Sequence, residues 1–340
     1  MGYDIVRSIM KVIANMLNII SIFTFSYRLF NRREPSPMNS SQFSRWLAGF
    51  IDGEGNFQVF LDRHYLRVMF RIRLHKDDIN VLQKIQEFLG VGRVVLDGNS
   101  CVFIISNIKD LINVLFPLLD TYNLYTTKWL DYIDFKKVVL FLSESNTTRV
   151  SFSQLEWAKN IINSMNLGRI EFNYSLIPVL RGVDPFWLLG FIEAEGTFGF
   201  KILSPFFQIG QHVRSLFVLE AIACYLNSIP KGFHFSLKSG APTVNFSLNK
   251  KTSVSVISIV NIDTLYDYLL FFLLDKSFQT RKGIDFHFWC IVLHLHKLGY
   301  FYLQEGRNLA YKISQYVNSN RYSTNPNPGQ TPSLAEIKKY

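Results

Sequence analysis

The feature that most constrains this chain is an internal repeat. A segment that begins at Trp46, WLAGFIDGEGNF, recurs at Trp187 as WLLGFIEAEGTF. Two further segments recur in the same order: FRIRLH at 70–75 matches FQIGQH at 207–212, and TTKWLD at 126–131 matches TRKGID at 280–285. The offsets between copies range from 137 to 154 residues, as loop insertions would make them. The repeat therefore predicts one chain built from two similar halves.

Composition limits the functions that such a chain can have. Its 340 residues are 48% hydrophobic and 18% charged, which allows a sizeable core and excludes global disorder. Lys and Arg number 36 against 26 Asp and Glu, a net charge of +10 that favours nucleic acid or an anionic membrane surface as partner. The three cysteines have no CxxC spacing, which excludes a disulfide framework and a zinc ribbon, and we expect them to be buried.

The chain is predicted to divide into five parts. Residues 1–40 are an apolar extension, in which the uncharged run 12–27 would span about 24 Å as a helix, short of the roughly 30 Å of a membrane core. We interpret this extension as a targeting stretch, a membrane anchor or the remnant of an upstream fused reading frame. The other parts are the first repeat at 41–143, a linker with one helix at 144–182, the second repeat at 183–318 and an irregular tail at 319–340.

Both halves are predicted to have the same order of helices and strands. An apolar helix ends at Gly55 or Gly196, and two strands with alternating apolar and polar residues follow it. A helix of period 3.6 begins near Ile79 or Leu216, and two shorter strands come after it. The fold class is therefore α+β.

Small residues on the repeated helices predict that the two helices pack on each other. Gly49 and Gly53 lie four residues apart on one helical face, and Gly190 and Ala194 repeat this spacing. Such residues let two helix backbones approach closely. The simplest partner for each helix is its own copy, packed around a pseudo-twofold axis.

That packing would bring together two acids, Glu54 and Glu195, at the last turns of the helices. A helix C-terminus carries partial negative charge, so two carboxylates placed there require a neutralising cation. Oxygen ligands of this kind suit Mg²⁺, which binds one or two carboxylates together with water and phosphate oxygens. A basic protein with such a site is predicted to catalyse metal-assisted phosphodiester hydrolysis.

The two repeated segments resemble the paired LAGLIDADG motifs of homing endonucleases and related intron maturases, over roughly residues 41–318. The resemblance implies two pseudo-symmetric αββαββα repeats, whose sheets form a saddle over DNA around two central motif helices. It also implies that Glu54 and Glu195 are the catalytic acids and metal ligands, with the carbonyls of Gly53 and Ala194 as further ligands.

Other site residues follow from the same resemblance. Gln211, beside His212, matches the position that organises water near the metal, whereas the first half has Leu74 there. Lys128 and Lys282 match the basic residue beside the scissile phosphate. Asp52 and Glu193 would lie about 200° around the helix from the catalytic acids, and we expect them to form caps or pairs locally.

Strand alternation predicts the side chains that face DNA. If Phe57, Val59 and Leu61 pack inward, the residues between them face outward, and the next strand turns its arginines to the same face. Arg and Gln side chains can make bidentate contacts to base edges, and lysines contact phosphates. The predicted DNA-binding residues are Asn56, Gln58, Phe60, Asp62, Arg67, Arg71, Arg73, Thr197, Gly199, Lys201, Gln208 and Lys238, with Lys231, Lys250 and Lys251 as additional phosphate contacts.

The leading hypothesis is a monomeric, Mg²⁺-dependent endonuclease that hydrolyses one phosphodiester on each strand of a long, asymmetric double-stranded DNA site. The alternative is a maturase that binds its host intron RNA and would tolerate loss of the acids. A membrane-tethered structural protein, a third reading based on residues 12–27, explains neither the repeat nor the charge. Composition and the resemblance favour a mitochondrial location, with the chloroplast as the alternative.

Overall fold

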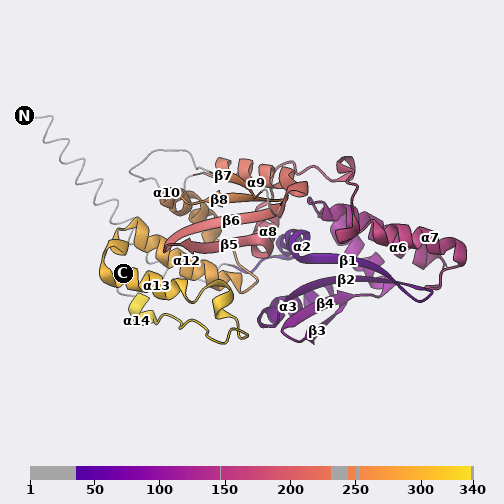
Figure 1. Cartoon of the computed structure of the whole chain (residues 1–340), viewed down its shortest axis with the longest axis horizontal. Helices are drawn as coiled ribbons and strands as arrows, with labels where there is room; N and C mark the ends of the chain where they lie inside the picture. The colour runs from indigo at the N-terminus through magenta and orange to yellow at the C-terminus, as the bar shows by residue number, and fades with distance from the viewer. Residues whose placement is uncertain (1–35, 146, 231–243, 250–252, 338–340) are drawn as a thin grey trace, which may run out of the picture.

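The structure is a computed structural model that describes residues 36–145, 147–230, 244–249 and 253–337. Two α+β halves lie side by side along the longest axis, and α2 (Ser40–Glu54) and α8 (Pro185–Glu195) lie between their sheets (Figure 1). The predicted extension, apart from residues 36–40, lies outside the described residues, as do Lys231, Lys238, Lys250 and Lys251.

Each half contains the predicted αββαββα order and one antiparallel four-stranded sheet. The strand order is β1-β2-β4-β3 in the first sheet and β5-β6-β8-β7 in the second. After α2 come β1 (Gly55–Asp62), β2 (Tyr65–His75), α3 (Ile79–Leu89), β3 (Arg93–Asp97), β4 (Ser100–Ile105), and the short α4 (Ile108–Asp110), η2 (Leu111–Leu115) and α5 (Phe116–Thr121). After α8 come β5 (Gly196–Lys201), β6 (Ser204–His212), α9 (Leu216–Ser228), β7 (Asn245–Asn249), β8 (Val254–Ile259), and the short α10 (Ile262–Thr264), η6 (Leu265–Leu270) and α11 (Phe271–Leu274).

Sequence signals at both ends of the motif helices account for their length. The Asn39 side chain caps the first turn of α2, and Asp184 caps α8 with Pro185 as its first residue. At the other end, Gly55 and Gly196 have extended backbone conformations, so each helix stops and a strand begins at once. The catalytic-acid candidates are therefore the last residues of their helices.

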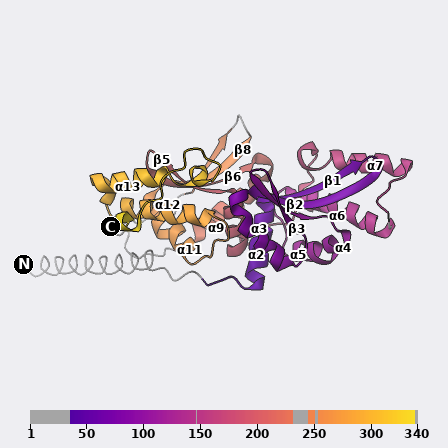
Figure 2. The same cartoon turned by 90° about the horizontal axis from the view of Figure 1, so that it is seen from below.

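The sheets pack on helices through one face only. Phe57 and Phe70 on neighbouring strands have ring centroids 5.2 Å apart, and Phe198 and Phe207 repeat this contact at 5.2 Å. These rings pack against α6 (Lys128–Ser145) and α12 (Lys282–Lys297). In the view of Figure 2, α5 is drawn lower than β1 and β2, and α9 and α11 are drawn lower than β5 and β6, on one side of each sheet. The side chains that alternate with these rings along β1 and β2 lie on the opposite face of the sheet, where they are half-buried or exposed.

The repeat extends further than the sequence indicated. The linker helix α7 (Phe152–Asn163) corresponds to α13 (Gln304–Ser314) in the second half, because an asparagine shortly after each helix makes the same contacts. The backbone N–H of Asn166 donates to Asp131 and its side-chain amide to the Phe57 carbonyl. Asn318 donates in the same way to Asp285 and Phe198. We infer that the first structural half runs to about Asn166.

Two expectations about the periphery need correction. Cys101 and Cys290 are buried as expected, but Cys224 is exposed. The tail contains the short α14 (Leu334–Ile337), and it also crosses to the first half, where the Tyr322 ring stacks on His75 with centroids 4.1 Å apart. Within the described part of the chain, no helix has the length and apolarity needed to span a membrane.

The α2–α8 contact is close enough to exclude any side chain at its centre. A Cβ at Gly49 would lie 2.0 Å from the Trp187 carbonyl oxygen, and a Cβ at Gly190 would lie 2.0 Å from that of Trp46. A methyl group at either position would force the backbones apart. The predicted packing of the two motif helices is therefore confirmed.

Gly49→Ala and Gly190→Ala should each lower the free energy of unfolding by about 3 kcal/mol or more, the upper end for overpacking, because the obstructing atom belongs to the backbone. Urea denaturation measures this loss. Gly210→Ala is the matched control, since its Cβ would meet no atom closer than 3.7 Å. If all three variants unfold at the urea concentration of the original chain, the two helices do not meet as described.

Candidate active site

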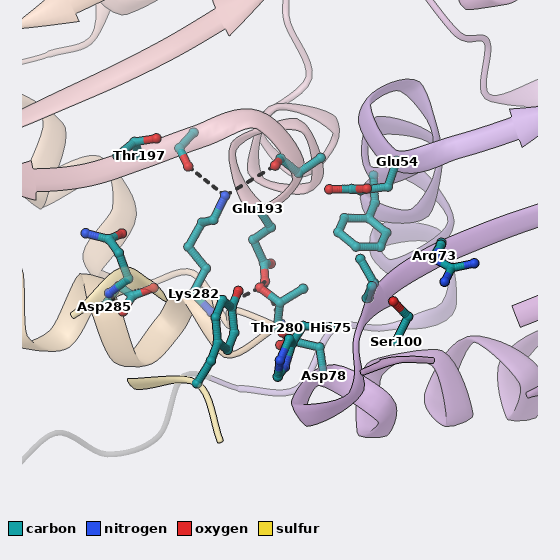
Figure 3. Close-up of a pocket in the computed structure, with 16 residues that line it drawn as sticks. Glu54, Arg73, His75, Asp78, Ser100, Glu193, Thr197, Thr280, Lys282 and Asp285 are labelled. Carbon is teal, nitrogen blue, oxygen red and sulfur yellow. Dashed lines mark hydrogen bonds between the residues drawn. The ribbon is translucent and has the colours of Figure 1, made fainter. Parts of the chain in front are cut away.

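Glu54 and Glu195 lie together where α2 and α8 end. The Glu195 side chain covers Gly53, since a Cβ there would lie 3.2 Å from the Glu195 Cγ atom. Glu54 reaches from α2 into a cavity of about 470 Å³, and Lys282 forms part of the facing wall (Figure 3). Burial raises the pKa of both carboxyls, and the neighbouring Glu195 carboxylate raises that of Glu54 further.

A half-buried lysine donates to the carbonyls at the negative end of each motif helix. The Lys128 Nζ donates to the carbonyls of Ile51, at 3.2 Å, and Gly53. Lys282 Nζ donates to those of Ile192, Ala194 and Gly196 at 3.2, 3.3 and 2.6 Å. Burial lowers the pKa of both ammonium groups, while the nearby carboxylates oppose that shift. Each lysine therefore lies beside acids whose negative charge favours its ammonium form.

The expectation that Asp52 and Glu193 form caps or pairs locally is wrong, because both accept hydrogen bonds from residues more than 70 positions away in the sequence. Asp52 accepts hydrogen bonds from the backbone N–H groups of Tyr125 and Thr126, at 2.6 and 3.1 Å. Glu193 accepts from the N–H of Thr280 at 2.6 Å and from its hydroxyl at 2.7 Å. Each acid therefore holds the segment just before its lysine. Burial raises the pKa of Asp52 to about 6, although these hydrogen bonds oppose the rise.

The two buried tryptophans differ in their partners. The Trp46 Nε1–H donates to Glu193 Oε1 at 2.7 Å. Trp187 is equally buried, but its Nε1–H has no hydrogen-bond partner within the described structure. Its pseudo-symmetric acceptor would be Asp52, whose side chain is one methylene shorter than that of Glu193. The repeat is thus symmetric in packing and asymmetric in hydrogen bonding.

The donor set fits a hard cation completed by its own water and by a substrate. The two half-buried acids supply carboxylate oxygens, and the carbonyls of Gly53 and Ala194 retain a second acceptor direction beside their lysine contacts. The described residues contain no group of three or more His, Cys, Asp or Glu side chains that could enclose a metal. Such an open oxygen site is typical of Mg²⁺ bound together with phosphate.

Comparisons with known proteins agree with this geometry. The family model described as LAGLIDADG endonuclease matches residues 47–139. An uncharacterized mitochondrial protein RF1 of Saccharomyces cerevisiae is 28% identical over 85% of this chain, and a probable intron-encoded endonuclease 3 of Neurospora crassa is 30% identical over 70%. The chain spans 62% and 52% of the lengths of these two relatives.

Among solved structures, I-SmaMI, a LAGLIDADG homing endonuclease, has the same fold. Its complex with uncleaved DNA in the presence of calcium ions superposes with a TM-score of 0.67 and 22% sequence identity, covering 82% of this chain and 98% of that one. The chain belongs to the LAGLIDADG endonuclease family. The fold and the recognised motifs predicted from the sequence are therefore confirmed.

The two LAGLIDADG centres are unequal. The Gln211 side chain on β6 forms a hydrogen bond with Glu195, and this bond lowers the pKa that burial raises. At the matching position of β2, Leu74 lines the cavity beside Glu54 and offers an apolar surface. The β-strand position that is polar beside Glu195 is therefore apolar beside Glu54.

Most of the predicted DNA-facing residues lie on the sheet face opposite the helices. The inward positions of β1 and β2 are buried except for the half-buried Leu61 and Leu74, and the intervening ones are half-buried or exposed, as the alternation predicts. The residues that lie at least partly exposed on that face are Asn56, Gln58, Phe60, Asp62, Arg67, Arg71, Arg73, Thr197, Lys201 and Gln208. Gly199 is an error in the prediction, because it is buried beneath the Phe206 ring of the neighbouring strand.

Sequence reasoning did not identify the residues that contact Asp52 and Glu193 or those that equate α7 with α13. Thr126 and Thr280 lie within the third repeated segment, so their recurrence was a usable signal for the contacts with Asp52 and Glu193. Asn166 and Asn318 lie in segments with little sequence likeness. Their equivalence emerges from their shared left-handed backbone, with φ of 54° and 59°, and from their contacts.

Glu54→Gln should raise the melting temperature of the metal-free protein at pH 8 by about 2 °C or more, roughly the effect of 1 kcal/mol in a chain of this size. Because the pKa of Glu54 is raised in the folded state, the folded protein loses stability as pH rises through that pKa and the carboxylate forms. The amide of Glu54→Gln carries no charge, so the variant does not suffer this loss. Differential scanning calorimetry with and without Mg²⁺ provides the measurement.

The exposed Glu87 on α3 offers a control, because Glu87→Gln removes the same charge from a side chain that does not line the cavity of Glu54. Mg²⁺ should raise the melting temperature of the Glu87→Gln variant and of the original chain more than that of Glu54→Gln. Equal melting temperatures for Glu54→Gln and the original chain, with equal responses to Mg²⁺, would contradict the assigned role of this acid.

Proposed function

We propose that this protein is a site-specific, Mg²⁺-dependent endonuclease that cuts both strands of double-stranded DNA, hydrolysing one phosphodiester on each. The observation that carries the proposal is the pair of half-buried acids, Glu54 and Glu195, at the ends of two helices in backbone contact. A half-buried lysine beside each acid adds the positive charge that a phosphodiester requires. Both centres lie in one chain, which supports a monomer.

The roles of the side chains follow from their positions. Glu54 and Glu195 would hold Mg²⁺, which when bound stabilises charge on the phosphate and makes bound water more acidic. Lys128 and Lys282 neutralise developing negative charge near the helix ends. Gln211 would orient a water molecule beside Glu195 while it also orients that carboxylate. The calcium-containing DNA complex of I-SmaMI supports the use of a divalent ion.

The outer sheet faces are proposed to bind the target. A net charge of +10 favours DNA, and Arg67, Arg71 and Arg73 line one strand of the first sheet. The two sheets present different side chains, so each half would read a different half-site and the whole site would be long and asymmetric. The predicted contacts of Lys238 lie outside the described residues.

The location and the alternative activity follow from the relatives and the site. One relative is named a mitochondrial protein and another an intron-encoded endonuclease, so we place this chain in the mitochondrion as the product of an intron reading frame. A maturase that binds its intron RNA would not require two acids, each with a half-buried lysine beside it. Their presence favours DNA cleavage over RNA binding alone.

Glu54→Gln and Glu195→Gln should each reduce double-strand cleavage at least about 100-fold, since an amide binds Mg²⁺ poorly, while DNA affinity stays within about threefold. The substrate is a duplex that joins the two exons flanking the reading frame, incubated with Mg²⁺ or with EDTA. Gel separation of nicked and linear products gives the rates.

The original chain should cut this duplex in Mg²⁺ and not in EDTA, and a scrambled duplex of equal length should stay intact. Cleavage in EDTA would contradict metal dependence. Cutting of both strands by either glutamine variant at the original rate would contradict the assignment of that acid.

Arg71→Ala should weaken binding by about 1–3 kcal/mol at a small set of base pairs and relax specificity there, since Arg71 is paired with Asn56 on the outer face near the site. Lys201→Ala, at the outer end of β5, should instead weaken all sequences alike, as loss of a phosphate contact does. Binding titrations against single-base variants at two salt concentrations distinguish these outcomes. A uniform loss with Arg71→Ala would show that this side chain does not contact bases.

A further inference from the structure

Two residues at helix starts form their side-chain bonds in the opposite half of the molecule. Asp78 occupies the N-cap position of α3, and Ser215 occupies that of α9. Asp and Ser at this position usually accept a hydrogen bond from their own helix. Neither does so here.

Both side chains instead accept hydrogen bonds from the backbone that precedes a lysine across the pseudo-twofold axis. Ser215 Oγ accepts from the N–H of Thr127 at 3.2 Å. Asp78 Oδ1 accepts from the N–H of Arg281 at 3.0 Å. Asp78 also lines the cavity that contains Glu54 and Lys282 (Figure 3).

These contacts combine with those of the buried motif acids. Asp52 and Glu193 hold Thr126 and Thr280, two residues before each lysine, from within the same half. Ser215 and Asp78 hold the next residue from the other half. Each lysine therefore follows two successive backbone groups that are fixed by different halves of the molecule.

The two crossing contacts start from strands of the proposed DNA-binding sheets. β2 leads through the short η1 (Lys76–Asp78) to Asp78, and β6 leads through η5 (Val213–Ser215) to Ser215. His75 and His212 end these strands and each accepts a hydrogen bond from the N–H two residues later. Through these turns and the bonds of Asp78 and Ser215, the end of each strand is connected to the segment that carries the lysine of the opposite half.

We propose that Asp78 and Ser215 are positioning residues that orient Lys282 and Lys128, respectively, from the opposite half. The proposal rests on the proposed endonuclease function, because it assigns each lysine to the cutting of one strand. It adds that each half helps to build the centre of the other, so that binding of one half-site contributes to the orientation of the lysine across the axis.

The turn from β2 through η1, residues 75–78, has other contacts that hold it in place when the Asp78 side chain alone is changed. Arg281 forms an ion pair with Asp77 at 2.9 Å. The tail adds a hydrogen bond from the Ser323 hydroxyl to Asp77 at 2.6 Å and a contact between Thr324 and His75 at 2.9 Å. A substitution at Asp78 therefore leaves these contacts in place. Asp78→Ala and Asp78→Asn both also remove a negative charge that acts on Glu54, and only Asp78→Asn keeps an acceptor for the Arg281 N–H.

Strand-resolved cleavage tests the proposal. A joined-exon duplex with a different fluorophore on each strand reports two rates, and Lys282→Met and Lys128→Met identify the strand that depends on each lysine. Asp78→Ala should slow the Lys282-dependent strand about tenfold and the other strand less than threefold, because small misplacements of a catalytic group are costly. Ser215→Ala should show the reverse pattern.

Matched variants separate positioning from general loss of structure. Asp78→Asn retains an acceptor oxygen and should restore most of the rate. Asn107→Ala and Asn261→Ala remove N-caps that bond only their own helices, and both should leave the ratio of the two strand rates unchanged. If Asp78→Ala and Ser215→Ala each slow both strands equally, or leave the ratio unchanged, the positioning role is wrong.

A second readout does not depend on cleavage. The amines of the metal-free protein are labelled with an acylating reagent, and the rate at each lysine is followed by peptide mass spectrometry. Asp78→Ala should raise labelling of Lys282 several-fold without changing Lys128, and Ser215→Ala should do the opposite. If the original chain cuts neither strand, the proposed function fails, whereas equal labelling of both lysines in each variant overturns the positioning role itself.

Discussion

The rest of the structure depends on the backbone contact between α2 and α8. At Gly49 and Gly190 each helix approaches the carbonyl of a tryptophan on the other so closely that a methyl group would not fit. Because the helices end five residues later, this contact also sets the separation of Glu54 and Glu195. A packing requirement in the core thus fixes the geometry of a site at its edge.

The same contact creates an electrostatic problem that other residues offset. Two helix C-termini and two acids are brought together out of water, and burial raises the pKa of both carboxyls. Lys128 and Lys282 offset this negative charge, because their ammonium groups donate hydrogen bonds to the carbonyls at the helix ends. Asp52 and Glu193 hold the segments that carry these lysines. These four charged residues, Lys128, Lys282, Asp52 and Glu193, support the proposed metal centre from around its two acids.

Sequence reasoning found the fold and the paired acids because both are encoded in short, local patterns. The spacing of Gly49 and Gly53 and its recurrence at Gly190 and Ala194 predicted the helix contact without knowledge of any loop. The partners of Asp52 were not predictable in this way, since they depend on where a segment 73 residues away lies. Gly199 was misjudged because strand alternation does not show that the Phe206 ring covers it. Asp78 has an ordinary capping residue's sequence context, and only the fold shows that it contacts the other half.

The central claim is that Glu54 and Glu195, at the ends of the two motif helices, bind divalent metal. Anomalous diffraction from crystals of the protein–DNA complex grown with Mn²⁺ tests it most directly. The account predicts anomalous density bounded by the carboxylates of Glu54 and Glu195, next to the backbone carbonyls of Gly53 and Ala194. Anomalous density found only elsewhere in the complex, with both acids bonded solely to lysines, would contradict it.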